Sequence, residues 1–267
     1  MINREKLLKA AMALDMQSYD QDLFLSFKNK FANWIHSSSQ LVTGLPDASY
    51  IVSGLTDAFN QTYSLYNKIG VFRGEYGYHK LVLGDRVTEN LDLADAIIIS
   101  HPFSADGMSS HEKLKIADSY NKPIFVDCAF FGICHGIEFD FTQYKNIHSV
   151  GFSLSKTFGT GYHRVGLLYT IDKYPVTVYS EWHYPFIASA KHHYDLIDKM
   201  SPDDMVTKYL NTQLQICAEL DVIPSNTILF GLDYTDKYLD FKRGDVNRLC
   251  LTTIISERYD HVKRTQQ

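Results

Sequence analysis

The sequence has little that suits an exported, membrane-spanning or nucleic-acid-binding protein. Its four cysteines form no CxxC pair, so we interpret them as buried small side chains in a reducing compartment and expect a cytoplasmic protein. The apolar runs are far shorter than the roughly 20 residues that cross a bilayer. Charges interrupt the N-terminal segment where a secretory signal is apolar, which argues against export by that route. The formal net charge is −5, and no run of lysine or arginine marks a surface for phosphate backbones.

The sequence also lacks the motifs of several common enzyme classes. It contains neither the glycine-rich GxxxxGK[ST] loop of nucleotide-binding enzymes nor the GxSxG turn of serine hydrolases. The pair His111 and Glu112 is not followed by the second histidine of HExxH, so no metal site is expected there. No internal repeat, low-complexity tract or linker divides the chain. A cofactor-free hydrolase, a metalloprotease and a repeat protein are therefore poor interpretations.

The composition is that of a globular protein with one substantial core. The chain has 267 residues, of which 45% are hydrophobic and 21% charged. Residues 1–44 predict N-terminal helices, the first over Glu5–Met16. In the second of these helices, apolar side chains recur at helical spacing and predict a buried face. They are Phe24, Phe27, Phe31, Trp34 and Ile35.

From residue 45 to about 175 the pattern changes to short apolar strands that alternate with amphipathic helices. The expected helices are Thr56–Tyr66 and Ser110–Tyr120. The expected strands are Tyr50–Ser53, Ile69–Phe72, Ala96–Ser100, Pro123–Val126, Ile147–Phe152 and Gly166–Thr170. Continuously apolar strands indicate burial on both faces, so we predict an α/β large domain with a mostly parallel sheet and flanking helices. Ligands of such sheets bind beyond the carboxyl ends of the strands.

Residues 176–267 predict a small C-terminal α+β domain. Asp203–Leu220 has a helical pattern, and Val246–Ile255 reads as a strand. The N-terminal helices are expected to lie near this part of the chain in space.

The most informative segment follows the expected strand that ends at Phe152. Ser153 and Ser155 precede Lys156, and a glycine-containing loop leads to Arg164. A single lysine is usually a solvated surface residue, and glycines are common in turns. A lysine held at a strand end beside apolar or cationic neighbours can, however, lose its proton and attack a carbonyl carbon. Hydroxyl groups and a guanidinium beside it can bind a phosphate.

This segment resembles the fold-type I pyridoxal-phosphate (PLP) enzymes, specifically the class I/II or aspartate-aminotransferase-like family. It matches the pattern S-x-[SA]-K, which is followed eight residues later by R-x-G. The resemblance implies that Lys156 carries PLP as a Schiff base and that Ser153 and Arg164 bind the cofactor phosphate. It also implies a homodimer, and relative to the family the N- and C-terminal parts are expected to be shortened.

An acidic residue ends another buried strand, 29 residues before Lys156. Asp127 could be a turn residue, which is common at strand ends. PLP chemistry requires a carboxylate against the pyridine nitrogen, because the protonated ring is the better electron sink. The resemblance assigns that role to Asp127, from the family's D-x-[AS]-Y pattern. Phe130 departs from this pattern, since the family's tyrosine there donates a hydrogen bond to the cofactor.

A strand that runs through a glycine into a helix offers an anion site. Gly54, Leu55 and Thr56 could form an ordinary turn with Thr56 as the helix cap, or helix amides and a hydroxyl could bind phosphate. The segment is similar to the family's G-[AST]-[ST]-x-A phosphate cup. Further on, the resemblance implies that an aromatic residue stacks on the pyridine ring, with Tyr76 as first choice and Tyr78 as second.

Two further segments complete the resemblance. Ser104 follows a strand and a proline in the position of the family's N-P-x-N-P-T-G loop, where an asparagine contacts the cofactor. Arg248 stands before a short apolar strand where the family has an arginine that binds the substrate carboxylate, with Arg243 as a poorer candidate. A planar guanidinium suits a carboxylate because it donates two parallel hydrogen bonds.

The sequence therefore predicts an aminotransferase that moves an amino group between an amino acid and a keto acid. Lys156 acts as the general base for the Cα proton, Asp127 keeps the ring protonated, and Arg248 holds the carboxylate. A PLP-dependent lyase or decarboxylase on the same scaffold is the alternative, because a fold does not fix a reaction. A third interpretation is a PLP-binding protein that has lost turnover, which the departures at Ser104 and Phe130 favour. The sequence does not identify the amino donor or the keto acceptor.

Overall fold

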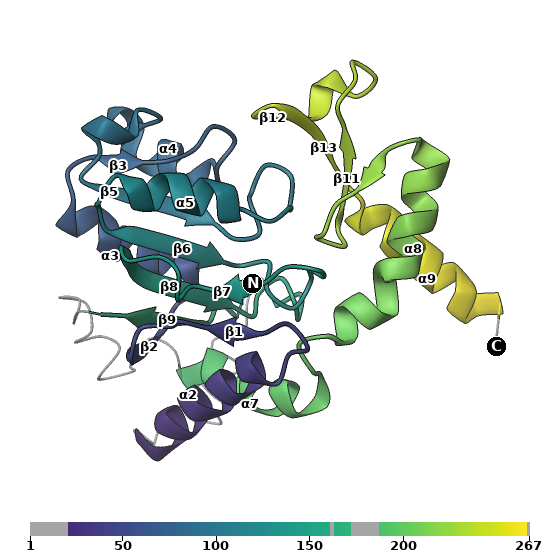
Figure 1. Cartoon of the computed structure of the whole chain (residues 1–267). Helices are drawn as coiled ribbons and strands as arrows, with labels where there is room; N and C mark the ends of the chain where they lie inside the picture. Colours follow the sequence, from purple (N-terminus) through teal and green to yellow (C-terminus); the bar gives the residue numbers. More distant parts are fainter. Residues whose placement is uncertain (1–20, 161–162, 172–186, 266–267) are drawn as a thin grey trace, which may run out of the picture.

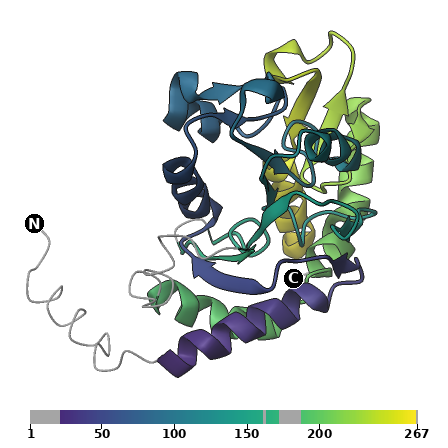
Figure 2. The same ribbon diagram turned by 60° about the vertical axis from the view of Figure 1, so that its left-hand side comes forward.

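A computed structural model describes residues 21–160, 163–171 and 187–265 (Figure 1 and, turned by 60°, Figure 2). The helix expected over Glu5–Met16 lies outside these residues. In the part of the chain that is described, no helix combines the length and the apolar character that a membrane crossing requires.

The centre of the fold is a seven-stranded sheet. Its strands, in spatial order, are β2 (Ala48–Val52), β9 (Gly166–Thr170), β8 (Ile147–Ser153), β6 (Ile124–Cys128), β5 (Ala96–Ser100), β3 (Ile69–Gly70) and β4 (Val87–Thr88). Strand β9 runs antiparallel to both of its neighbours, and every other pair in the sheet is parallel. This confirms the predicted mostly parallel α/β sheet. The six expected strands are present, and β4 was not expected.

Helices cover both faces of the sheet, as the apolar strands predicted. Every residue of β5, β6, β8 and β9 is buried. Alternate residues of one strand face opposite layers, because successive side chains of a strand point to opposite sides. Ile97 and Ile99 of β5 join the core that contains α2 (Gln21–His36) and α5 (His111–Ser119). Ile98 joins the core under α3 (Leu55–Leu65) and α4 (Tyr78–Leu83).

Four of the five apolar residues predicted to form the buried face of the second N-terminal helix are buried. Phe27, Phe31, Trp34 and Ile35 lie in the core, on one side of α2. The side chain of the fifth, Phe24, lies outside the part of the chain that is described. The same helix packs against α7 (Ile187–Lys199), and the Trp34 indole Nε1 donates to the Met200 carbonyl oxygen over 2.7 Å. Two helices that are far apart in the sequence, α2 and α7, thus lie side by side below the large sheet (Figure 1).

The C-terminal part builds a second, antiparallel sheet. Its strand order is β10 (Ile223–Pro224), β11 (Phe230–Asp233), β13 (Val246–Cys250) and β12 (Lys242–Arg243), flanked by α8 (Asp204–Leu220) and α9 (Thr252–Thr265). These elements stand beside the large sheet in Figure 1. The remaining short elements are β1 (Val42–Thr43) paired with β7 (Phe139–Asp140), and the 3₁₀ turns Gly84–Arg86, Leu91–Leu93 and Leu239–Phe241.

The C-terminal end of one predicted strand in this part of the chain was wrong. The strand expected over Val246–Ile255 stops at Cys250, and α9 begins at Thr252. Leu251 and Ile255 are four residues apart and both buried against α8, the spacing of one helix face. The Ile255 amide donates to the Leu251 carbonyl oxygen over 2.9 Å, which closes the first turn of the helix. An apolar run of this kind is compatible with both structures until its packing partner is known.

Candidate active site

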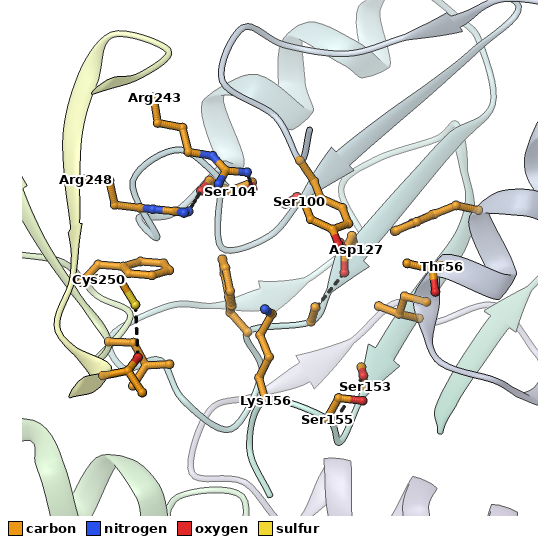
Figure 3. A pocket seen from close by; sticks show the side chains of 18 of the residues that line it. Thr56, Ser100, Ser104, Asp127, Ser153, Ser155, Lys156, Arg243, Arg248 and Cys250 are labelled. Atoms are coloured by element: carbon orange, nitrogen blue, oxygen red, sulfur yellow. Dashed lines mark hydrogen bonds between the residues drawn. The ribbon is translucent and has the colours of Figure 1, made fainter. Parts of the chain in front are cut away.

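A cavity of about 350 Å³ lies between the carboxyl ends of the large sheet and the small antiparallel sheet (Figure 3). Ten residues were predicted to form the site, and nine of them line this cavity: Leu55, Thr56, Tyr76, Ser104, Asp127, Ser153, Lys156, Arg164 and Arg248. The tenth, Gly54, does not line the cavity but lies beside the Arg164 guanidinium, which does. Residues between 54 and 248 in sequence are therefore collected in one space, as the parallel topology requires.

Lys156 enters the cavity from the turn that follows β8. The turn is anchored because the Thr157 hydroxyl donates to the Phe131 carbonyl oxygen over 2.8 Å. The Lys156 Nζ lies 5.2 Å from the centre of the Phe130 ring and points up into the cavity in Figure 3. Burial lowers the pKa of this amine, opposed by the Asp127 carboxylate and reinforced by the Arg248 charge. A neutral amine is the nucleophilic form of lysine.

Asp127 is the buried acid of the site. It is the fourth residue of β6, and its Oδ1 accepts a hydrogen bond from the Ala129 amide over 2.8 Å. Burial raises the pKa of Asp127 to about 6, against the lowering effects of that hydrogen bond and of Lys156. A cationic or hydrogen-bond-donating partner in the cavity would stabilise the ionised form of this buried carboxyl group.

A second buried acid, Glu75, was missed by the sequence analysis. Its side chain accepts hydrogen bonds from the Ser100 amide and the Tyr76 amide, each over 2.8 Å, and from the Ser100 hydroxyl. Burial raises the pKa of Glu75 to about 7. Glu75 thereby joins the loop after β3 to the end of β5 and fixes Tyr76 at the cavity wall. The only available signal was an acid inside a glycine- and tyrosine-rich loop.

Hydroxyl and guanidinium groups gather at the N-terminus of α3. Gly54 occupies the N-cap position with φ 74°, so the alternative in which Thr56 caps the helix is wrong. The Arg164 Nη2 donates to the Thr56 hydroxyl over 3.0 Å. A Cβ atom on Gly54 would lie 2.8 Å from the same Nη2, so only glycine leaves this close approach free.

Two serines complete this side of the cavity. The Ser155 amide donates to the Ser153 hydroxyl oxygen over 3.3 Å. The Ser155 Oγ is buried and has no hydrogen-bond partner among the residues described. Buried hydroxyl groups are normally hydrogen-bonded, so this one is available to a ligand.

Two arginines enter the cavity from the hairpin formed by β12 and β13. The Arg243 Nη2 donates to the Ser104 hydroxyl over 3.1 Å, and the Arg248 Nη1 donates to the Ser104 carbonyl oxygen. The Arg248 guanidinium lies 4.3 Å from the centre of the Phe230 ring. Burial and the charge of Arg243 lower the pKa of Arg248 to about 10. Both arginines therefore converge on the one loop residue that was expected to contact a cofactor.

The sequence analysis named only part of the cavity wall. Residues that line it without having been predicted are Phe59, Ser100, Ala129, Ser155, Leu229, Phe230, Cys250 and Thr252. Tyr78, the second choice for a stacking ring, is not among the lining residues, and it stacks on Tyr76 with ring centres 5.9 Å apart. None of these eight residues carries a charged side chain, so nothing in the sequence separates them from other core positions.

Comparison with protein-family models gives no match, and comparison with curated sequences gives none either. Comparison with solved structures finds clear similarity. The histidinol-phosphate aminotransferase of Clostridium acetobutylicum aligns with a TM-score of 0.63 and 14% identity, over 94% of this chain and 91% of that one. The histidinol-phosphate aminotransferase of Sinorhizobium meliloti, solved with pyridoxal-5'-phosphate, aligns at 0.58 and 16% identity, over 90% and 74%.

A third similar structure is an L-threonine-O-3-phosphate decarboxylase from Porphyromonas gingivalis. It aligns with a TM-score of 0.58 and 13% identity, over 87% of this chain and 82% of that one. Sequence identity is low in all three cases, so the likeness concerns the fold. The chain has the fold of these aminotransferases and of this decarboxylase, which confirms the architecture that the sequence resemblance predicted.

Proposed function

We propose that this protein is a PLP-dependent aminotransferase that moves an amino group between an amino acid and a keto acid. The observation that carries this proposal is the meeting of three groups in one cavity. The Lys156 amine has a lowered pKa, the Asp127 carboxyl is buried, and hydroxyl groups lie beside the Arg164 guanidinium. The similar structures support it, since one of them was solved with the same cofactor.

The residues present fit that cofactor. The cavity, at about 350 Å³, falls in the size range of small-molecule sites, roughly 300–1,000 Å³. Thr56, Ser153 and Arg164 supply donors for a phosphate, and the unpartnered Ser155 hydroxyl adds another. The glycine at position 54 leaves the backbone at the start of α3 open to an anion.

When bound, PLP supplies an electron sink for the bond that breaks at the substrate's Cα. Lys156 would hold the cofactor covalently through Nζ, which takes the place of the aldehyde oxygen lost as water. Once a substrate amine has displaced it, the freed Lys156 amine would move the Cα proton as a general base. Its lowered pKa serves both tasks, because each needs the neutral amine. Tyr76, held by Glu75, is the aromatic wall against which a ring can stack.

Asp127 would hold the proton at the pyridine nitrogen. A buried carboxylate without a cationic partner is unfavourable, which is why burial raises the pKa of Asp127. A protonated ring nitrogen would supply the opposite charge and favour the ionised form of Asp127. Arg248, whose guanidinium lies over the Phe230 ring, would orient the substrate by donating two parallel hydrogen bonds to its α-carboxylate.

A lyase or decarboxylase is the alternative reaction, and the structural likeness to a decarboxylase favours it specifically. The same Lys156, Asp127 and phosphate donors serve either reaction, because PLP stabilises whichever Cα bond is broken. A protein that binds PLP without turnover is the third candidate. The Ser104 hydroxyl, already hydrogen-bonded to Arg243, and the phenyl ring of Phe130 support that reading.

One experiment separates these reactions. The PLP-loaded protein is mixed with a series of amino acids while its absorption spectrum is recorded. An aminotransferase shifts the spectrum to the pyridoxamine form and releases keto acid in equal amount. A lyase or decarboxylase returns to the starting spectrum and releases ammonia or carbon dioxide. A protein without turnover releases no keto acid, ammonia or carbon dioxide from any amino acid. Lys156→Ala abolishes the starting band, whereas Lys145→Ala, at an exposed lysine, leaves it unchanged.

The expected compartment and assembly belong to the same proposal. The four cysteines are unpaired, and three of them are buried, which supports a reducing cytoplasmic environment. A homodimer is expected from the family resemblance. Sedimentation equilibrium at several concentrations tests it, and a mass of 30.6 kDa at every concentration contradicts it.

A further inference from the structure

Two buried carboxyl groups, rather than one, stand at the end of the cavity that holds Asp127. Asp127 and Ser100 are register partners on the neighbouring parallel strands β6 and β5. Their side chains therefore leave the sheet on the same side, and both line the cavity (Figure 3). Glu75 accepts hydrogen bonds from the Ser100 amide, over 2.8 Å, and from the Ser100 hydroxyl. Ser100 is thus the single residue that links the two acids.

Neither acid has a cationic partner. Glu75 and Asp127 are only 8% and 6% exposed. Among the residues described, no lysine, arginine or histidine nitrogen lies within 4.0 Å of either carboxylate. The groups that contact Glu75 are three uncharged donors, the Ser100 amide and hydroxyl and the Tyr76 amide. Burial raises the pKa of Glu75 to about 7, and the charge of Asp127 adds to the rise, so Glu75 is only partly ionised at neutral pH.

The cations that act on this pair do so at longer range. Arg243 of β12 interacts electrostatically with Glu75, and Lys156 interacts in the same way with Asp127. Lys156 is also the amine expected to attach the cofactor, so its free ammonium group is not kept when PLP is bound. A positive charge beside Ser100 would therefore find two acids without a close counter-charge.

The other titratable groups packed around the pair are uncharged. His79 packs against the Tyr76 ring with ring centres 5.8 Å apart, and burial lowers the pKa of His79 to about 4. Burial raises the pKa values of Tyr63 and Cys128, and the charge of Asp127 raises both further. His79, Tyr63 and Cys128 are therefore neutral near pH 7 and do not contribute to a change of charge there.

Under the proposed function, on which this step rests, PLP brings a positive charge to this place. Its protonated ring nitrogen is expected against Asp127, one residue away from Glu75. Both acids are already buried, so the ring removes little further water from them, and the attraction of its charge dominates its effect on Glu75. The cofactor phosphate has the opposite sign, but it is expected beside the Arg164 guanidinium, which offsets its charge. PLP binding is therefore expected to lower the pKa of Glu75.

We propose that Glu75 is a second acid of the ring-nitrogen site, which releases its proton to solvent when PLP binds and reinforces the charge of Asp127. It is a positioning residue, because it acts through Ser100 and Tyr76 and does not itself line the cavity. A carboxylate only accepts hydrogen bonds, whereas a neutral carboxyl donates one, so the three donors around Glu75 favour its ionised form. Once ionised, Glu75 adds a negative charge that keeps the ring nitrogen protonated.

Counting protons during PLP binding tests this without turnover. PLP is titrated calorimetrically into the cofactor-free protein at pH 7, in buffers whose heats of ionisation differ. The dependence of the observed heat on the buffer gives the number of protons released. We expect the wild type to release up to about half a proton more than Glu75→Gln, since a group at its pKa is half protonated. Protons from Lys156 and Asp127 are common to both proteins and cancel in the difference.

The pH dependence of PLP affinity separates this role from a purely structural one. At low pH Glu75 is neutral with and without PLP, and at high pH it is ionised in both and attracts the ring. We expect the wild type to gain about 10-fold in PLP affinity relative to Glu75→Gln from pH 5.5 to 8.5, because an opposite charge nearby lowers a carboxyl pKa by about one unit or more. A loosened Tyr76 alone would weaken PLP binding by the same factor at every pH.

Two further variants assign the effect to the acid at this position. Glu75→Asp keeps a carboxyl group and retains the pH dependence, even where the shorter side chain lowers the affinity. Glu89→Gln makes the same chemical change at an exposed glutamate and behaves like the wild type. Circular dichroism confirms that each variant is folded.

Equal proton release by the wild type and Glu75→Gln at pH 7 overturns the inference, and so does a ratio of their PLP affinities that is constant with pH. If Glu75→Gln fails to fold, infrared difference spectroscopy of the wild type decides. Loss of the C=O stretch of a protonated carboxyl on PLP binding at pH 7 supports the inference, and an unchanged band overturns it. A wild-type protein that takes up no PLP overturns the proposed function and this inference with it, whereas a loaded protein with equal proton release overturns the inference alone.

Discussion

At the scale of single residues, the site depends on groups whose charge is shifted by burial. The Lys156 pKa is lowered and the pKa values of Asp127 and Glu75 are raised, to about 6 and about 7. Desolvation is the largest cause in each case, since it disfavours whichever form is charged. Such shifts are frequent at functional sites, where proton transfer requires them.

Replacing Asp127 by asparagine tests its role at the ring nitrogen. Asparagine has nearly the same shape but cannot stabilise a protonated pyridine. We expect Asp127→Asn to retain PLP and its absorption band and to lose roughly 100-fold or more in kcat, the usual effect of removing one charge-stabilising contact. Asp85→Asn, at an exposed aspartate, is the matched control. Full activity in Asp127→Asn contradicts the assigned role.

The sequence predicted those site residues whose neighbours along the chain already suggest their chemistry. Lys156 stands between two hydroxyl residues and a glycine-containing loop, and Asp127 ends an apolar strand. Glu75 was missed because its importance arises from the Ser100 amide and hydroxyl, 25 residues away, which only folding brings together. Arg243 was given as the poorer candidate for the carboxylate arginine, because the resemblance maps that role to Arg248.

At the scale of elements, the six expected strands and two expected helices of the large sheet lie within two residues of their predicted ends, whereas β4 and α4 were not predicted. Continuous apolar runs define β5, β6 and β8 locally, without reference to the rest of the fold. The end of β13 was not predicted, because Leu251 and Ile255 form a helix face only against α8. The hairpin that brings Arg243 and Arg248 into the cavity could not be derived either, since it depends on contact with the Ser104 loop.

The N-terminus of α3 offers a test at this scale. Gly54→Ala adds a Cβ that lies 2.8 Å from the Arg164 Nη2 and moves the guanidinium. We expect PLP to bind at least several-fold more weakly because its phosphate loses a charge-assisted hydrogen bond. Gly84→Ala is the control, since that glycine also has a positive φ but nothing lies within 4 Å of its Cβ position. Both glycines have a positive φ and lie outside the left-handed helical region, with ψ 168° at Gly54 and −120° at Gly84, so alanine strains the backbone at both positions. Equal PLP affinity in the two variants contradicts the proposed cup.

At the scale of the whole molecule, the cavity exists because two parts of the fold meet across it. The large sheet contributes Lys156 and Asp127, and the antiparallel sheet contributes Arg243 and Arg248. The Arg73 guanidinium lies 3.4 Å from the Asp245 carboxylate at the outer edge of this contact. That ion pair is largely exposed and adds little stability.

Buried acids at this junction make stability depend on pH. The pKa of Glu75 is about 7 in the folded protein and near 4.5 when unfolded. The unfolded chain therefore loses its proton first as pH rises, and the contribution of Glu75 to the free energy of unfolding, fully present below pH 4.5, is lost by pH 7. The buried His79 and His101 act oppositely, because burial lowers their pKa values to about 4.

Comparing the wild type with Glu75→Gln isolates the acid. The histidines are common to both proteins, so their contribution cancels. Without PLP, we expect the free energy of unfolding of the wild type to fall relative to that of Glu75→Gln by about 3 kcal/mol as the pH rises from 4.5 to 7. Urea unfolding across this range measures it. A difference that stays constant with pH shows that Glu75 does not hold its proton in the folded state.

The covalent attachment at position 156 is the central claim, and borohydride reduction followed by peptide mass spectrometry tests it most directly. The protein is incubated with PLP, reduced and digested, and the wild type is compared with Lys156→Ala and Lys145→Ala. We predict that the pyridoxyl mass is found on the peptide containing Lys156 in the wild type and in Lys145→Ala, and on no peptide of Lys156→Ala. Stoichiometric labelling of another lysine, or none at all in the wild type, contradicts the account.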